Sequence, residues 1–220
     1  MQLNYEQISQ IEHYLKKKGV YYEDIKIELL DHICIQIEAL MSSGYDFNTS
    51  FEEIVEKWDP MLSYSSSFYL GYTYSKPKII IDKMKLRVKG YVYKTWCIIL
   101  LFLTFIYFTG HDIAVNNSQV INIFSLSFLY VSCIAIVAGY FFIRKTKQKT
   151  SYRFLYETQI LPILTVPIIL SNSILNKDGN LDLLKFMLLV FIVIAIPFGI
   201  ELFKKHVEIS KKYSDYETIE

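Results

Sequence analysis

The segment VINIFSLSFLYVSCIAIVAGYFFI, residues 120–143, contains no charged side chain. It is long enough to cross a bilayer as a helix, which takes about 20 apolar residues. Three further apolar segments lie at 91–109, 158–175 and 183–203. Four such segments in succession are not typical of the core helices of a soluble protein. The sequence therefore predicts a four-span membrane domain over residues 91–203.

The composition separates this membrane domain from the rest of the chain. Of the 220 residues, 52% are hydrophobic, which is high for a soluble domain of this size. Residues 1–90 instead alternate charged and apolar side chains, as a water-soluble head would. The formal net charge of +1 gives no global basic field, so we expect no direct binding of nucleic acid.

Basic residues gather on one side of the predicted spans. The 144–157 loop holds five Lys or Arg residues, whereas the 110–119 loop holds none. Because basic loops stay in the cytoplasm, we expect a multi-pass membrane protein with both termini cytoplasmic. Basic side chains next to the spans should also contact anionic lipids, each contributing about 1 kcal/mol. The predicted lipid contacts are Lys83, Lys85, Arg87, Lys89, Arg144 and Lys145.

The central parts of the spans contain no Asp, Glu, Lys, Arg or His, which argues against a proton relay or an ion-coupled transporter. A lipid-acting enzyme would need polar groups at the cytoplasmic interface. The sequence has four candidate groups there: Arg153, Tyr156, Glu157 and Glu201. We therefore expect no enzyme, no catalytic residue and no cofactor, and keep the lipid-acting enzyme as the weakest alternative.

The head, residues 1–58, reads as three helices. Asn4 and Gln7 form a capping-box pattern at the start of the first helix, and Gly19 is placed to end it. The second helix should cover 22–42, with an apolar stripe that recurs every three or four residues. A third helix should begin near Thr49 or Ser50 and stop at Asp59, because the residue before a proline disfavours the helical region. The fold class expected is all-α.

Residues 59–90 are expected to form a linker and a basic juxtamembrane segment, and residues 204–220 a cytoplasmic tail. Within the linker, residues 60–76 are rich in serine and tyrosine. That composition fits either a loose linker or an aromatic-rich helix, and the sequence does not decide between them.

Three residues of the second helix could act as metal ligands or as acid/base groups. They are Glu28, Asp31 and His32, and their spacing lets them share one face. A metal site would need more ligands, and His13 is the only other histidine expected nearby. A catalytic site would need an activated nucleophile or a pocket, and the neighbouring sequence supplies neither. We interpret the three residues as a polar rim that docks a protein partner, and expect no metal.

The stretch from Tyr21 to Trp58 resembles the HAAS type (helix-turn-helix-associated alpha-helical signalling) of cytoplasmic domain found in many bacterial membrane proteins. With the preceding helix, the resemblance covers roughly residues 5–58. The resemblance is carried by Glu28-Leu29 with His32, by Gly44 in a turn, and by the segment 50–53, Ser-Phe-Glu-Glu. Ile54 stands where the family often has alanine. The resemblance implies a signalling role and a cytoplasmic partner such as a PadR-like transcription regulator. It implies no catalytic residue.

Together these patterns predict a signalling or regulatory membrane protein whose helical head docks a cytoplasmic protein partner, and whose spans contact membrane lipids. A homo-oligomer is compatible with this reading. The alternative is an accessory subunit of a larger membrane assembly such as a permease, because short loops and charge-free spans suit that role equally well.

Overall fold

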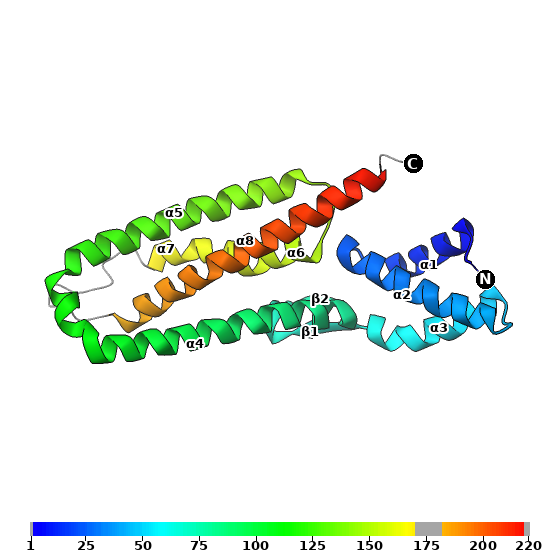
Figure 1. The fold of residues 1–220 in the computed structure, drawn as a ribbon, viewed down its shortest axis with the longest axis horizontal. Coiled ribbons are helices and arrows are strands. Elements are labelled where there is room, and N and C mark those ends of the chain that lie inside the picture. Colours follow the sequence, from blue (N-terminus) through cyan, green and yellow to red (C-terminus); the bar gives the residue numbers. More distant parts are fainter. Residues whose placement is uncertain (1, 170–181, 218–220) are drawn as a thin grey trace. The chain divides into compact units, whose positions relative to one another are not determined.

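The computed structural model describes residues 2–169 and 182–217, except for the side chains of residues 102, 105–116, 118, 169 and 214–217. The chain divides into two compact units (Figure 1). Unit 1 comprises Met1–Val88 and Gln148–Ser151, and unit 2 comprises Lys89–Lys147 and Tyr152–Glu220. Each unit is described on its own below.

Three helices form the first part of unit 1: α1 (Tyr5–Lys17), α2 (Glu23–Ser42) and α3 (Phe47–Leu62). Helix α2 packs against both of the others. Its apolar stripe is buried as the periodicity predicts, at Ile25, Leu29, Ile33 and Ile37. Each of these side chains is at most 1% exposed, so together they contribute several kcal/mol of hydrophobic stabilisation at roughly 2 kcal/mol each.

Both ends of α1 confirm their sequence signals. The Asn4 side chain accepts the Gln7 backbone N–H, and the Gln7 side chain accepts the Asn4 N–H, each at 2.9 Å. At the other end Gly19 has φ of 85°, and the Val20 N–H donates to the Leu15 carbonyl at 3.0 Å. This is a Schellman motif, for which glycine is the preferred residue because it alone adopts positive φ without strain.

Both predicted ends of α3 are wrong. The helix starts at Phe47 because Asp46 is the N-cap: its carboxylate accepts the N–H groups of Asn48 and Thr49. It also continues through Pro60 to Leu62 instead of stopping at Asp59. The extra turn buries Leu62 to 1% exposure, and this burial outweighs the local preference of the residue before the proline.

Residues 60–76 are neither a loose linker nor an aromatic-rich helix. Past the end of α3 they form an antiparallel hairpin of β1 (Tyr64–Ser67) and β2 (Gly71–Pro77), joined by a 3₁₀ turn η1 (Phe68–Leu70). Tyrosine, serine and threonine fill both strands, and tyrosine and threonine favour extended structure. Gly71 provides the positive φ of 93° after the turn. The chain is nonetheless mostly helical, as predicted.

Helix α4 (Lys78–Asn116) begins directly after the hairpin. Its first three turns bury an apolar face within unit 1, formed by Ile79, Ile80, Ile81, Met84 and Val88. Residues 59–88, which the sequence assigned to a connector, are therefore part of a compact unit. The helix also continues through most of the predicted 110–119 loop, because no proline and only one glycine interrupt it there.

Unit 2 is built around α5 (Ser118–Lys145) and α8 (Leu183–Glu217), which pack against each other. Between them in sequence lie α6 (Ser151–Leu155), the π-helical turn η2 (Tyr156–Ile160), the 3₁₀ segment η3 (Leu161–Thr165) and α7 (Val166–Ile169). Pro162 and Pro167 stand in this irregular stretch, where each removes a helical hydrogen-bond donor.

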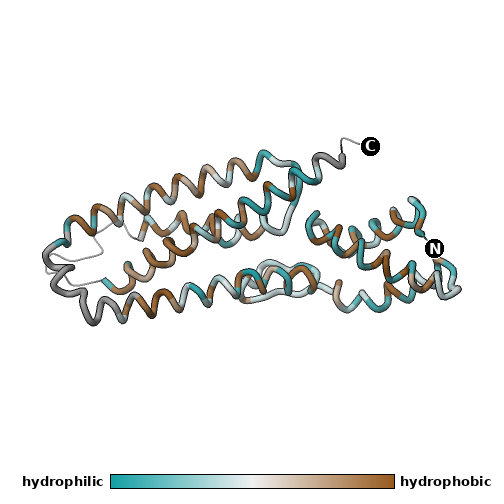
Figure 2. The backbone as a smooth tube through the Cα atoms, viewed as in Figure 1, coloured by the Kyte–Doolittle hydropathy of each residue, from teal (hydrophilic) through white to brown (hydrophobic). Residues whose placement is uncertain are grey.

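Among the described residues, two helical segments are long and apolar enough to cross a membrane: Gln119–Lys145 and Leu183–Tyr213. Gln119–Lys145 is apolar over most of its length, whereas Leu183–Tyr213 is apolar in its first part and becomes hydrophilic toward its C-terminal end (Figure 2). The structure thus shows two candidate spans and not the predicted four-helix transmembrane bundle. The expected span at 91–109 lies within α4. The one at 158–175 is divided among η2, η3 and α7, and its last six residues lie outside the described part of the chain.

Candidate functional site

The polar rim predicted on α2 lies on the surface of unit 1. The side chains of Glu28 and His32 are 51% and 56% exposed, with 4.0 Å between Glu28 Oε1 and His32 Nε2. Asp31 is also exposed. Glu28 forms an ion pair with Lys83 of α4 and so helps to hold α4 on α2. Asp31 and His32 are the members of the rim that remain open to a partner.

One turn before the rim, Asp24 forms a site that the sequence did not predict. Its side chain is only 7% exposed. Oδ1 accepts the backbone N–H of Ser151 at 2.8 Å, and Oδ2 accepts the Ser151 hydroxyl. Ser151 is separated from Asp24 by 127 positions and is fully buried. We call its segment, Gln148–Ser151, the docked loop.

The docked loop also caps α2. Tyr22 is the N-cap residue of α2 and makes no side-chain capping hydrogen bond. The Glu23 N–H instead donates to the carbonyl of Lys149 at 2.9 Å. Because the first N–H groups of a helix have no partner within it, the loop supplies an acceptor that the N-cap side chain does not. Thr150, which lies between these two contacts, is 1% exposed.

Arg87 of α4 completes the site. Its Nη1 donates to the Ser151 hydroxyl at 2.5 Å and lies 3.7 Å from Asp24 Oδ2. The Ser151 hydroxyl is therefore held between a guanidinium donor and a carboxylate acceptor. Hydrogen bonds to charged groups in a site shielded from water are stronger than neutral ones. The arrangement fixes three segments, α2, α4 and the docked loop, at one point of unit 1.

The predicted lipid contacts fall into two groups. Lys83 and Arg87 are engaged by Glu28 and by the Asp24 site. Lys85 and Lys89 are half-buried, and Lys89 Nζ lies 5.7 Å from the Tyr93 ring. The remaining two, Arg144 and Lys145, are exposed at the end of α5 and lie over the rings of Tyr140 and Phe142. Lipid contact stays a prediction for all six, and these last two are the most accessible.

A second polar cluster joins α1 to α3. The Tyr14 hydroxyl donates to Asp59 Oδ1 at 2.6 Å, and Lys18 Nζ lies 2.8 Å from the same oxygen. The hydrogen bonds from Lys18 and Tyr14 lower the pKa of Asp59. Burial, and then the hydrogen bond to Asp59, raise the pKa of Tyr14. This cluster holds α1 and α3 together.

Of the four groups considered for a lipid-acting enzyme, Arg153, Tyr156 and Glu157 make structural contacts in unit 2, and Glu201 is exposed on α8. Arg153 Nε donates to Glu157 Oε1 at 3.1 Å, and the Tyr156 hydroxyl donates to the carbonyl of Ile136 at 2.9 Å. Within the described part of the chain, no three His, Cys, Asp or Glu side chains gather as a metal site. Cys34, Cys97 and Cys133 are free thiols, and burial above all raises the pKa of Cys34 to about 11.

Sequence reasoning missed Asp24 and Ser151 for a physical reason. Asp24 looks like an ordinary first-turn acid that suits the helix dipole, and Ser151 looks like part of a basic cytoplasmic loop. No local spacing connects residues 127 positions apart. The one available signal is that the N-cap position of α2 is occupied by Tyr22, a residue type that does not cap helices with its side chain.

Comparison with protein-family models, curated proteins and solved structures found no match to this chain. The resemblance to the HAAS type therefore stays a prediction, and the function must be argued from the geometry.

Proposed function

We propose that this chain is an integral membrane protein of the bacterial inner membrane, in which unit 1 relays a state of the membrane part to a cytoplasmic protein partner. Support for membrane insertion comes from the low buried fraction of the two candidate spans. Only 22% of the apolar window of Gln119–Lys145 and 33% of that of Leu183–Tyr213 are buried within the structure. A core helix of a soluble protein would bury most of such a surface.

The observation that carries the relay is the capture of the docked loop by Asp24 and Arg87. The loop connects α5, a candidate span, to α6 and belongs to unit 1 rather than to unit 2. A displacement at the end of α5 would pull on the Ser151 contacts and on the Lys149 carbonyl that caps α2. Helix α2 carries Asp31 and His32 about two turns further on, where a bound partner would sense the displacement of the helix.

The expected topology has several membrane crossings, with both termini and the 144–157 loop in the cytoplasm. The partner is a soluble protein, and the resemblance to the HAAS type makes a PadR-like regulator the first candidate.

The test is crosslinking of the full chain in membranes of the source bacterium, followed by identification of the captured proteins. Asp31→Ala and His32→Ala should each weaken capture of a soluble partner. Glu53→Ala, an exposed change on α3, is the matched control and should leave capture unchanged. Capture of integral membrane proteins alone, insensitive to the α2 variants, would favour the accessory-subunit alternative and contradict the relay.

A further inference from the structure

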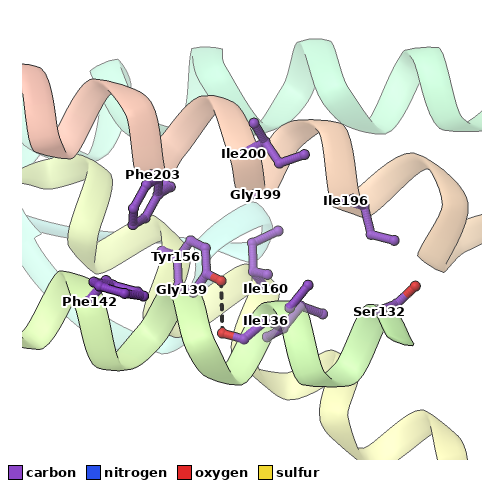
Figure 3. A pocket seen from close by; sticks show the side chains of 11 residues that line it. Ser132, Ile136, Gly139, Phe142, Tyr156, Ile160, Ile196, Gly199, Ile200 and Phe203 are labelled. Carbon is purple, nitrogen blue, oxygen red and sulfur yellow. Dashed lines mark hydrogen bonds between the residues drawn. The ribbon is translucent and has the colours of Figure 1, made fainter. Parts of the chain in front are cut away.

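A cavity of about 250 Å³ lies within unit 2, between α5, η2 and α8. Its walls are mostly apolar, and Tyr156 and Ile160 of η2 project between the two long helices (Figure 3). It exceeds the ~150 Å³ of an apolar protein cavity that admits benzene, and is slightly smaller than the ~300 Å³ at which drug-sized pockets begin. Its size suits a slender apolar guest.

Two glycines make room for this site. A Cβ at Gly139 of α5 would collide with the Tyr156 hydroxyl, and a Cβ at Gly199 of α8 would lie 3.3 Å from Ile160 Cγ2. The η2 side chains therefore approach both helices where a side chain is absent. The hydrogen bond from Tyr156 to the Ile136 carbonyl, drawn in Figure 3, fixes the tyrosine ring in the wall.

The polar atoms of the lining are already satisfied. The Tyr156 hydroxyl bonds to Ile136, and Ser132 Oγ donates to the carbonyl of Phe128 at 2.6 Å. A polar guest would lose its hydrogen bonds to water and gain none here, which costs free energy. An apolar guest has no such cost and gains the hydrophobic contribution.

Positive charge marks one end of the cavity. Lys145 Nζ lies 5.2 Å from the centre of the Phe142 ring, which lines the cavity. On α8, the exposed Lys204 follows the lining residue Phe203. Arg144 and Lys205 stand beside these two lysines but already have Glu157 and Glu208 as partners. Lys145 thus brings a cation to the cavity wall at Phe142, and Lys204 is the exposed basic residue of α8 next in sequence to the lining.

We propose that the cavity binds one acyl chain of an anionic phospholipid whose headgroup lies against Lys145 and Lys204. The apolar walls select the chain, and the two ammonium groups select the negative headgroup. The inference rests on the proposed function, because that function places α5 and α8 in a bilayer, where phospholipid is the surrounding solvent.

The test uses the full chain, purified in detergent and reconstituted in vesicles of phosphatidylcholine and phosphatidylglycerol. After re-extraction, retained lipids are counted by native mass spectrometry. We expect one phosphatidylglycerol per chain, retained in preference to phosphatidylcholine. Ala135→Trp fills the cavity and should weaken retention about tenfold, since each excluded methylene is worth about a factor of four. Ala138→Trp, on the same helix but outside the lining, is the matched control.

Further variants separate headgroup from chain. Lys145→Gln combined with Lys204→Gln should abolish the preference for phosphatidylglycerol, whereas the exposed Lys147→Gln should preserve it. Ile196→Phe fills the same cavity from α8, so the test survives if the tryptophan variant fails to fold.

Three results for the wild-type chain would each overturn the proposal. The chain could retain no phospholipid, it could retain both lipids equally, or a second copy of the chain could cover the cavity. Equal losses in Ala135→Trp and Ala138→Trp would also overturn it. Resistance of the vesicle-bound chain to extraction at alkaline pH is measured in parallel. An integrated chain without bound lipid contradicts this inference alone, whereas a chain that fails to integrate contradicts the proposed function.

Discussion

Replacing Asp24 by asparagine should release the docked loop from α2 without unfolding unit 1. The carboxylate accepts two hydrogen bonds from Ser151 and faces the Arg87 guanidinium. A hydrogen bond to a charged group contributes about 1.5–3 kcal/mol. Asparagine keeps one carbonyl acceptor but turns an NH₂ group toward the second donor. We therefore expect the loop to lose about 2 kcal/mol, which is roughly a 30-fold increase in local opening.

Hydrogen exchange on the full chain, read by mass spectrometry, measures this opening directly. Two reporters are the backbone N–H groups of Ser151 and Glu23, because both are bonded across the site. Both should exchange about 30-fold faster in Asp24→Asn. Asp31→Asn makes the same chemical change at an exposed position of the same helix and should leave both unchanged.

Wild-type exchange rates at Ser151 and Glu23 in the Asp24→Asn protein would refute the reasoning. A double-mutant cycle with Ser151→Ala adds a second criterion. Both changes affect the hydrogen bond from the Ser151 hydroxyl to the Asp24 carboxylate, so their effects should be non-additive by about 1 kcal/mol or more. Simple additivity would mean that the Ser151 hydroxyl and the Asp24 carboxylate do not interact.

Three further predictions concern unit 1. Gly19→Ala should destabilise it by at least about 1 kcal/mol, because alanine is strained at φ of 85° and its Cβ would collide with the Tyr64 hydroxyl. The matched control is Gly44→Ala, where nothing lies within 4 Å of the new Cβ. Chemical denaturation should show the smaller loss of stability for this control. Tyr14→Phe should cost about 1 kcal/mol at neutral pH. Lys18 and Tyr14 lower the pKa of Asp59, so the contribution of Asp59 to folding stability is present above about pH 4 and is lost as the pH falls through the folded pKa. The pKa of Tyr14 is raised, so its contribution to folding stability is present below about pH 10 and is lost at higher pH. Denaturation midpoints of the wild type should fall at both extremes, and Tyr14→Phe should flatten the alkaline fall. Finally, the reactivity of Cys34 can be measured in a chain where Cys97 and Cys133 are replaced by serine. Because the pKa of Cys34 is raised to about 11, iodoacetamide should alkylate it about a hundredfold more slowly at pH 8 than an ordinary thiol. An alkylation rate that has already reached its plateau at pH 9 would contradict this.

The sequence by itself determined the elements whose signals are local. The capping box at Asn4, the Schellman glycine at Gly19 and the buried stripe of α2 follow from interactions within about one helical turn, so a reading along the chain finds them. Length and hydropathy likewise identify the apolar segments 120–143 and 183–203, which lie within the candidate spans Gln119–Lys145 and Leu183–Tyr213. These are properties of short segments and need no knowledge of what packs against them.

Tertiary structure decided what depends on distant partners. Helix α3 passes Pro60 because Leu62 finds a buried place, and the 60–76 stretch becomes a hairpin because its two halves pair with each other. The Asp24 site exists only because the docked loop returns to α2 after 127 positions. Hydrogen bonds and burial depend on distance in space, and a one-dimensional pattern does not contain the distances between segments that the fold brings together.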